Sequence, residues 1–234
     1  MTAVSASATS IATMADLFEH LGGVATERVR FRPSPGTATE QDVLAVHARE
    51  KRLCELVDGV LVEKAVGFRE SCLALAFSGA LRAFVRPRNL GLVSGPDGLI
   101  RLAAGLVRIP DVAFISWQRI PARRTPTEPI PEIVPDLAVE VLSEGNTPEE
   151  MARKRQEYFA AGVRLVWFVN LQTRTVEVFT DVDQSHLLDE RQTLDGTPVL
   201  PGFTLPLREL FAELDPVRQC STRPARRRSA REGC

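Results

Sequence analysis

Two carboxylates stand out because each lies where the chain has the pattern of a buried β-strand. Glu140 occupies the middle of the apolar run 135–143, which begins with Pro135 and is followed by Gly145. Asp111 follows Pro110 and lies within a second apolar segment, residues 106–116. A charge buried without a partner costs roughly several kcal/mol. Glu140 therefore requires a cation, a proton or strong hydrogen-bond donors.

The two segments can bring these carboxylates together if their strands are neighbours in one sheet. Side chains alternate along a strand, so Asp136, Glu140 and Leu142 share one face. Oxygen ligands of this kind suit Mg²⁺ or Mn²⁺. Such an ion can activate water and stabilise charge on a phosphate. The pattern predicts a metal site made of Asp111 and Glu140, with hydrolysis of a phosphate ester as its chemistry.

A lysine beside the two carboxylates would complete this chemistry. The position two residues after Glu140 faces the same way, but it holds Leu142. The nearest lysine along the chain is Lys154, on the helix that follows, where it could reach back over the end of the strand. Because Lys154 lies within three consecutive basic residues, a solvated helix face is the alternative.

The remaining segments predict an α/β protein with a mixed β-sheet flanked by helices. Asp58-Gly59 between apolar arms indicates a hairpin over 53–64. Thr147-Pro148 opens a helix that stops at Gly162, and an apolar strand, 163–169, follows. A strand, a helix and a strand in this order indicate a parallel pair. The other predicted elements are helices 11–21, 69–85 and one beginning after Thr39, a strand–turn–strand unit over 90–102, a strand 175–180 after the parallel pair, and a short helix within 202–214.

Each candidate residue has a simpler structural interpretation. Glu140 could bind an arginine such as Arg108 or Arg164, and Asp111 could be a turn residue after proline. Tyr158 is predicted to be core, and Glu55 and Glu63 are predicted to be exposed on the hairpin.

Composition limits the classes of protein that remain. Apolar residues make up 44% of the chain and charged residues 25%, as in soluble globular proteins. No apolar run approaches the ~20 residues that span a bilayer, and the N-terminal stretch lacks the pattern of a secretory signal. Cys54 and Cys72 look like buried apolar residues, so neither a disulfide framework nor a zinc site is indicated. We expect a cytoplasmic protein.

Charge is distributed unevenly along the chain. Residues 216–234 hold six arginines and one glutamate, a formal charge of +5, which leaves −6 on residues 1–215. An acidic body is not typical of a protein that binds mainly through phosphate contacts. We interpret the tail as a solvated disordered arm, and a non-specific nucleic-acid tether is the alternative.

At these residues the chain resembles the Uma-type restriction endonucleases of the PD-(D/E)XK, restriction-endonuclease-like superfamily. The resemblance covers about residues 50–210. The matching stretches are 54–59, 109–112, 139–143, Lys154 with Tyr158, and 161–167. It implies a metal-dependent phosphodiesterase with a restriction-endonuclease-like core, in which Asp111 and Glu140 bind the metal. It also implies that Glu70 is the outer acidic residue, that Lys154 replaces the lysine missing from the ExK pattern, and that the protein is a homodimer.

Two functions from different classes follow. The first is a divalent-metal-dependent endonuclease that cleaves DNA, with Asp111, Glu140, Lys154 and Glu70 in its site. The second is a nuclease-fold adaptor without catalysis that binds nucleic acid or protein, which Leu142 and the acidic body favour. A hydrolase using Ser143 or Ser116 is a distant third, because no histidine has the context of a base. We divide the chain into a leader and helical extension (1–49), the nuclease-like domain (50–214) and the basic tail (215–234).

Overall fold

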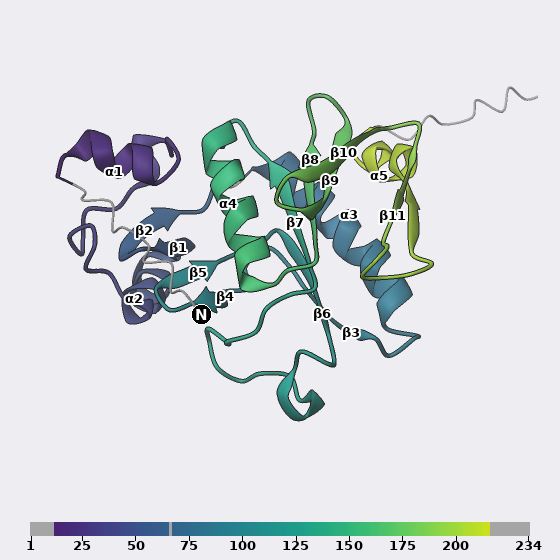
Figure 1. Ribbon diagram of the computed structural model, residues 1–234, viewed down its shortest axis with the longest axis horizontal. Coiled ribbons are helices and arrows are strands. Elements are labelled where there is room, and N and C mark those ends of the chain that lie inside the picture. The colour runs from purple at the N-terminus through teal and green to yellow at the C-terminus, as the bar shows by residue number, and fades with distance from the viewer. Residues whose placement is uncertain (1–11, 66, 216–234) are drawn as a thin grey trace, which may run out of the picture.

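The larger of two main sheets contains the strand of Glu140. In the computed structural model, which describes residues 12–65 and 67–215, this sheet has six strands in the order β10-β9-β8-β7-β6-β3 (Figure 1). Only the β7–β8 pairing is parallel, so the predicted mixed sheet and parallel pair are confirmed. The strands are β3 (Gly91–Ser94), β6 (Val112–Ser116), β7 (Leu137–Leu142), β8 (Leu165–Asn170), β9 (Thr175–Asp181) and β10 (Gln184–Asp189).

The smaller sheet is antiparallel and has the order β2-β1-β5-β4. Its strands are β1 (Cys54–Val57), β2 (Val60–Glu63), β4 (Ile100–Ala103) and β5 (Leu106–Arg108). Asp58 and Gly59 both have positive φ, 49° and 74°, as a tight hairpin turn requires. The predicted hairpin is therefore confirmed. A separate ribbon pairs β11 (Thr193–Asp195) with β12 (Thr204–Pro206).

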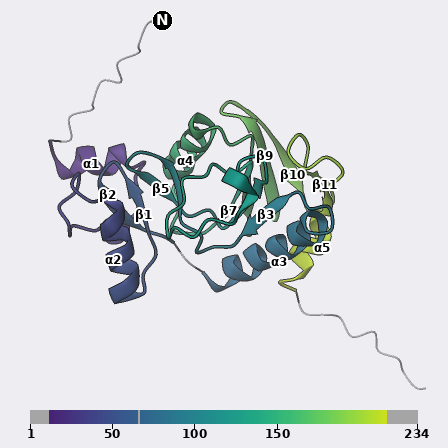
Figure 2. The ribbon, with the colours of Figure 1, turned by 90° about the horizontal axis from the view of Figure 1, so that it is seen from below.

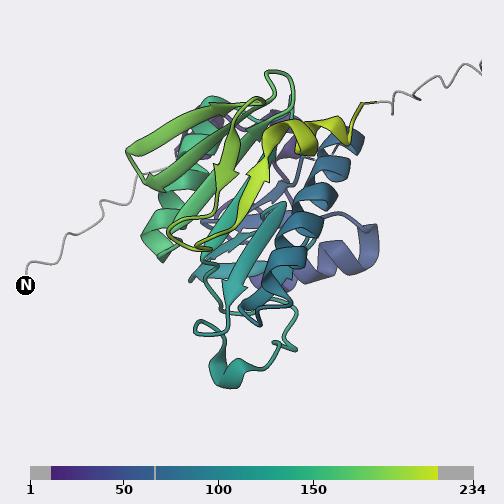
Figure 3. The same ribbon diagram turned by 90° about the vertical axis from the view of Figure 1, so that its right-hand side faces the viewer.

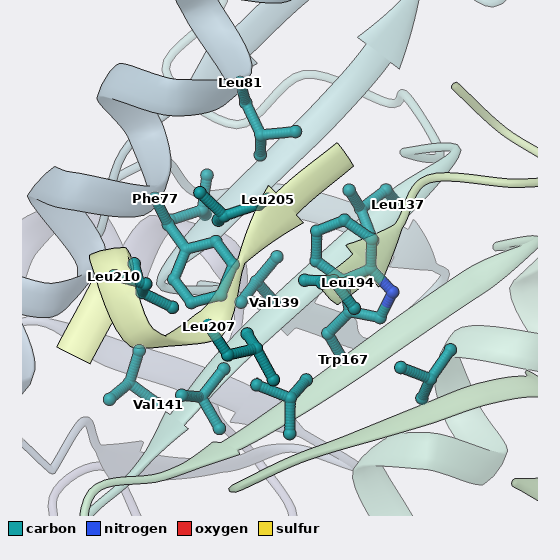
Figure 4. Close-up of a cluster of buried hydrophobic side chains, with 14 of the residues drawn as sticks. Phe77, Leu81, Leu137, Val139, Val141, Trp167, Leu194, Leu205, Leu207 and Leu210 are labelled. Carbon is teal, nitrogen blue, oxygen red and sulfur yellow. The ribbon is translucent and has the colours of Figure 1, made fainter. Parts of the chain in front are cut away.

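Helices cover both faces of the larger sheet, with α3 (Phe68–Val85) on one side and α4 (Pro148–Ala161) on the other (Figure 2). On the α3 side, Phe77 packs in one core with Val139 and Trp167. Leu205, Leu207 and Leu210, from β12 and α5 (Leu207–Ala212), close this core (Figure 4), and α5 lies beside α3 (Figure 3). On the α4 side, Tyr158 packs with residues of β7 and β8. The alternation of β7 therefore sends Glu140 toward α4.

Helix α4 begins and ends where the sequence predicts. The Thr147 side chain accepts a hydrogen bond from the amide of Glu150, Pro148 takes the first helical position, and Gly162 ends the helix with φ 98°. Proline lacks only an amide that would be unpaired there, and glycine adopts positive φ without strain. These local signals fix the helix that bears Lys154.

The N-terminal segment packs against the smaller sheet and α4. It comprises α1 (Met14–His20), a 3₁₀ turn (Thr26–Arg28) and α2 (Glu40–Glu50). In α2, Val43 and Val46 pack with residues of β1 and β2. Arg28 joins this segment to α4 through a buried ion pair with Glu150, at 2.8 Å. Among the described residues, no helix is both long enough and apolar enough to cross a membrane.

One predicted strand is wrong, and another predicted unit is divided between the two sheets. Segment 106–116 is not one strand: β5 belongs to the smaller sheet and β6 to the larger, and residues 109–111 cross between them. Pro110 has no amide to continue a ladder, so the chain breaks there. Segment 90–102 contains the predicted strand, turn and strand, but its two strands belong to different sheets, because β3 pairs with β6 and β4 with β5. The predicted leader falls largely on residues 1–11 and the basic tail on 216–234, outside the described residues.

Candidate active site

Asp111 lies at the crossing from β5 to β6 and is held by both sheets. Its Oδ2 accepts a hydrogen bond from the Val141 amide of β7 at 2.7 Å. Its Oδ1 is 2.9 Å from Nζ of Lys64, which follows β2. Val112 is opposite Val139 in the β6–β7 ladder, which places Asp111 across from Glu140. The two strands are neighbours, as the sequence predicts.

Glu140 is buried between β7 and α4, with 4% of its surface exposed. Its Oε1 accepts a hydrogen bond from the Tyr158 hydroxyl at 2.5 Å, and both carboxylate oxygens are 3.4 Å from Lys154 Nζ. Burial raises the pKa of Glu140, and the negative charges of Asp111 and Glu55 raise it further, against the opposing charge of Lys154. The suggested arginine partners are wrong: Arg108 binds Glu55 and Glu157, and Arg164 binds Asp136. Tyr158, predicted as core, is buried but also bonds Glu140.

Lys154 reaches the end of β7 from α4 and bridges two carboxylates. Its Nζ is 3.4 Å from Glu140 and 3.1 Å from Glu55, and the residue is 3% exposed. It therefore does not belong to a solvated helix face. Burial alone would lower the pKa of Lys154, but Glu140 and Glu55 outweigh burial and raise it. The ammonium stays charged at neutral pH.

Glu55 is a member of this cluster that the sequence prediction missed. Predicted to be exposed, it has no exposed surface. Its carboxylate is 2.7 Å from Arg108, accepts a hydrogen bond from the Ile109 amide at 3.1 Å, and contacts Lys154. Burial raises its pKa, but Lys154 and Arg108 bring the pKa down to about 2. Glu63, the other hairpin carboxylate, is partly buried and pairs with Arg30 and Arg52.

The signal for Glu55 is the same one that identifies Glu140. Every residue of β1 is buried, because α2 and the N-terminal segment pack against its apolar side chains and Lys154 of α4 contacts Glu55. A carboxylate within an otherwise apolar strand, 53–57, requires a partner, as Glu140 does. A nearby turn signal favoured an exposed position instead.

Glu55 also belongs to an ion-pair chain that runs from the site to the surface. We define this chain by eight residues: seven of alternating charge, Glu140, Lys154, Glu55, Arg108, Glu157, Arg153 and Asp58, and His20, whose Nε2 contacts Asp58. Asp58 is half exposed in the hairpin turn, and His20 is on α1. The chain therefore connects the candidate site with both the smaller sheet and the N-terminal segment.

Asp111 opens onto a cleft of about 270 Å³, here called the Asp111 cleft. Its lining residues are Leu53, Lys64, Ala65, Gly67, Glu70, Ser71, Pro96, Asp97, Asp111 and Val141. Glu70, in the first turn of α3, thus shares a cavity with Asp111. A Cβ at Gly67 would lie 2.0 Å from the Glu70 carboxylate, so glycine leaves the room that this carboxylate occupies. The structure brings Asp111 and Glu70 together, with Glu140 and Lys154 directly behind Asp111.

The donor set fits a hard divalent cation. Glu70, Asp97 and Asp111 give the cleft three carboxylates against one lysine, and the Asp111 charge raises the pKa of Glu140. Among residues 12–65 and 67–215, no three His, Cys, Asp or Glu side chains are close enough to enclose a metal. Mg²⁺ commonly uses one or two carboxylates and takes its other ligands from water and substrate phosphate. Asp136, on the same strand face as Glu140, binds Arg119 and Arg164 instead.

The fold and this site define a protein of nuclease-like architecture. The crystal structure of "a putative nuclease belonging to DUF820" from Anabaena variabilis shares the fold, with a TM-score of 0.63 at 18% sequence identity. The similarity covers 70% of this chain and 92% of that one. The family model of Uma2, described as "Putative restriction endonuclease", matches residues 39–208, and the chain belongs to this family. No curated protein matches the chain.

The family match confirms the resemblance that the sequence motifs indicate. It begins at residue 39, the N-cap of α2, and so includes a helix that precedes the suggested boundary at residue 50. The division at residues 49 and 214 stays a prediction.

Proposed function

We propose that the protein is a divalent-metal-dependent endonuclease that hydrolyses phosphodiester bonds in DNA, with Mg²⁺ or Mn²⁺ as its ion. The observation that carries this proposal is the pair of carboxylates, Asp111 and Glu140, which lie opposite each other across the β6–β7 pairing, with Asp111 lining the Asp111 cleft. Membership of the Uma2 family supports a nucleic-acid substrate.

Asp111 and Glu140 would hold the ion, and Glu70 would be the outer acidic residue. The ion, when bound, supplies an activated water and stabilises charge on the phosphate. Tyr158 donates its hydrogen bond to Oε1 of Glu140, whereas, within the part of the chain that the structure describes, Oε2 has only the longer Lys154 contact. Oε2 is therefore the freer oxygen. Lys154 keeps a positive charge beside Glu140 and so favours the ionised carboxylate that a metal needs.

Cleavage of supercoiled and single-stranded DNA with Mg²⁺ or Mn²⁺ tests this function. The wild type should cut, and Asp111→Asn and Glu140→Gln, which keep side-chain shape, should abolish cutting. Lys154→Ala should reduce it if Lys154 takes part. Glu149→Gln is the matched control, because Glu149 is exposed on the first turn of α4. Equal activity in Glu140→Gln and the wild type would remove Glu140 from the site and overturn the proposal.

The alternative function is a nuclease-fold adaptor without catalysis. One observation favours it: each site carboxylate already contacts a lysine, Asp111 with Lys64 and Glu140 with Lys154. Leu142 also occupies the lysine position of the ExK pattern. The adaptor predicts binding of nucleic acid or protein without cutting, and no heat of Mn²⁺ binding in calorimetry. Mn²⁺ binding that Asp111→Asn abolishes would favour the enzyme.

We also propose that the protein is a cytoplasmic homodimer. Phe68 and Leu75 are large apolar side chains that lie mostly exposed on α3, as an interface would use them. Cys54 and Cys72 are free thiols, as a reducing compartment would keep them. Light scattering should give the mass of a dimer for the wild type and of a monomer for Leu75→Glu. Cell fractionation checks the compartment.

A further inference from the structure

Lys64 is a second lysine in the candidate site, supplied by a different sheet from Lys154. It directly follows β2, and its amide donates to the carbonyl of Leu53 at 2.9 Å. The side chain is 5% exposed and lines the Asp111 cleft together with Asp111 and Glu70. The hairpin thus delivers an ammonium group to the wall of the cavity where the substrate would bind.

The Lys64 ammonium group is held by three oxygen atoms. Its Nζ is 2.9 Å from Asp111 Oδ1, 2.6 Å from the carbonyl of Ile109 and 2.9 Å from the carbonyl of Pro96. An ammonium group has three donors, so each of them has an acceptor. Two of the acceptors belong to the chain around Asp111, which fixes Lys64 relative to the carboxylate. Lys64 is therefore pre-positioned at Asp111.

Lys154 occupies a different place. It is buried between Glu55, Glu140 and Tyr158, and it is not among the residues that line the Asp111 cleft. To reach a phosphate there, its ammonium group would have to leave both carboxylates. Glu55 would keep Arg108, but buried Glu140 would lose the cation that it contacts. Its contacts suit the positioning of Glu140 rather than contact with substrate.

The composition of the chain supports a special role for both buried lysines. Of the 29 basic residues, three are lysines: Lys51, Lys64 and Lys154. Arginine and lysine are not interchangeable, because ammonium is a compact point charge whereas guanidinium is a wide planar fork. In a chain that otherwise uses arginine, two of the three lysines lie at Asp111 and Glu140.

We propose that Lys64 is the lysine that contacts the substrate phosphate in the Asp111 cleft, whereas Lys154 is a positioning residue for Glu140. When nucleic acid binds, the Lys64 ammonium group would keep its hydrogen bonds to the carbonyls of Pro96 and Ile109. The N–H that now points to Asp111 would turn toward a phosphate oxygen. Asp111 Oδ1 would then be free for the metal ion. This inference rests on the proposed function, because it places nucleic acid in the cleft.

The salt dependence of DNA binding separates the two lysines without requiring turnover. Each phosphate contact contributes about one unit to the slope of log affinity against log salt. The protein is titrated into a fluorescent DNA duplex in buffer that contains Ca²⁺, a hard cation of the same charge as Mg²⁺. A gel checks that the duplex stays intact. We expect Lys64→Met to lower the slope by about one unit and to slow cleavage in Mg²⁺ about 100-fold. Lys154→Met and the exposed Lys51→Met should keep the wild-type slope.

An unchanged slope in folded Lys64→Met would overturn the inference and leave Lys64 as a clamp on Asp111. If Lys64→Met does not fold, the same comparison is made between Asp111→Asn and Asp111→Asn/Lys64→Met, because the double variant leaves no unpaired charge. If the wild type binds DNA but never cuts it, the proposed nuclease activity is refuted. A slope that is about one unit lower in Lys64→Met would still support the contact between Lys64 and phosphate. A wild type that binds no DNA would refute both.

Discussion

Replacing Lys154 with methionine removes the cation shared by Glu55 and Glu140, and its cost can be estimated from the structure. Lys154 is the foremost of the charges that hold the pKa of Glu55 at about 2 rather than the usual 4.5. At 1.36 kcal/mol per pKa unit, that shift corresponds to about 3 kcal/mol. Breaking a buried ion pair on one side costs ~3–5 kcal/mol. We expect Lys154→Met to lower the free energy of unfolding by about this amount at neutral pH.

The loss should depend on pH in a defined direction. In the wild type the pKa of Glu55 is below its unfolded value, so its contribution is present above about pH 4.5 and is lost as the pH falls toward 2. The pKa of Glu140 is raised, so the stability that its protonated form provides is present at low pH and is lost as the pH rises through that raised pKa. Without Lys154 both carboxylates take up protons at higher pH. The pKa of Lys154 itself is raised above the usual 10.5, so its contribution is fully present only below that pH. The deficit of the variant should therefore be largest in mildly alkaline buffer, below pH 10.5, and shrink on acidification.

Urea unfolding followed by tryptophan fluorescence measures this deficit, because Trp167 is fully buried in the core. The measurement is made at an alkaline and at an acidic pH, with Lys51→Met as the control for loss of an exposed lysine. Methionine keeps the length of the side chain, so the cavity contribution is small. A deficit that is equal at both pH values would refute the reasoning. A deficit below about 1 kcal/mol would also refute it, because that size is typical of an exposed ion pair.

Two further predictions concern the neighbours of the site carboxylates. Tyr158→Phe removes the hydrogen bond to Glu140 Oε1, so the pKa of Glu140 should rise, unfolding should become easier by about 1–2 kcal/mol, and the acidic limb of a cleavage pH profile should move to higher pH. Gly67→Ala would place a Cβ 2.0 Å from the flexible end of Glu70; the carboxylate should swing out of the Asp111 cleft, which weakens Mn²⁺ binding in calorimetry and leaves the melting temperature nearly unchanged.

The local signals in the sequence predicted the parts of the fold that depend on neighbouring residues. Thr147, Pro148 and Gly162 define α4, Asp58-Gly59 defines the hairpin turn, and the apolar run around Glu140 defines β7. In each case the physical cause lies within a few residues of the element. The position of Asp111 opposite Glu140 followed because the two strands are adjacent in the sheet.

The apolar run around Glu55 is a local signal of burial, but the partners of Glu55 and the position of Lys64 could not be predicted from local signals. Glu55 and Lys64 reach the site only because the chain crosses from the smaller sheet to the larger at residues 109–111. Their burial comes from α4 and from the chain around Asp111, which are distant in sequence. A hairpin considered alone has one face in water, so the turn signal predicts an exposed Glu55. Tertiary packing, not strand propensity, decided the environment of both residues.

The ion-pair chain has a consequence for how this sequence can diverge. Its members alternate in sign from Glu140 to Asp58, and the inner ones are buried, so one neutral substitution takes one of two opposite charges away from each inner neighbour. Substitution is tolerated best when adjacent members change together, for example Glu55 with Arg108. Relatives should therefore covary at these positions, and the covariation should extend from β7 into α1. A residue on the N-terminal segment would then change together with residues of the candidate site.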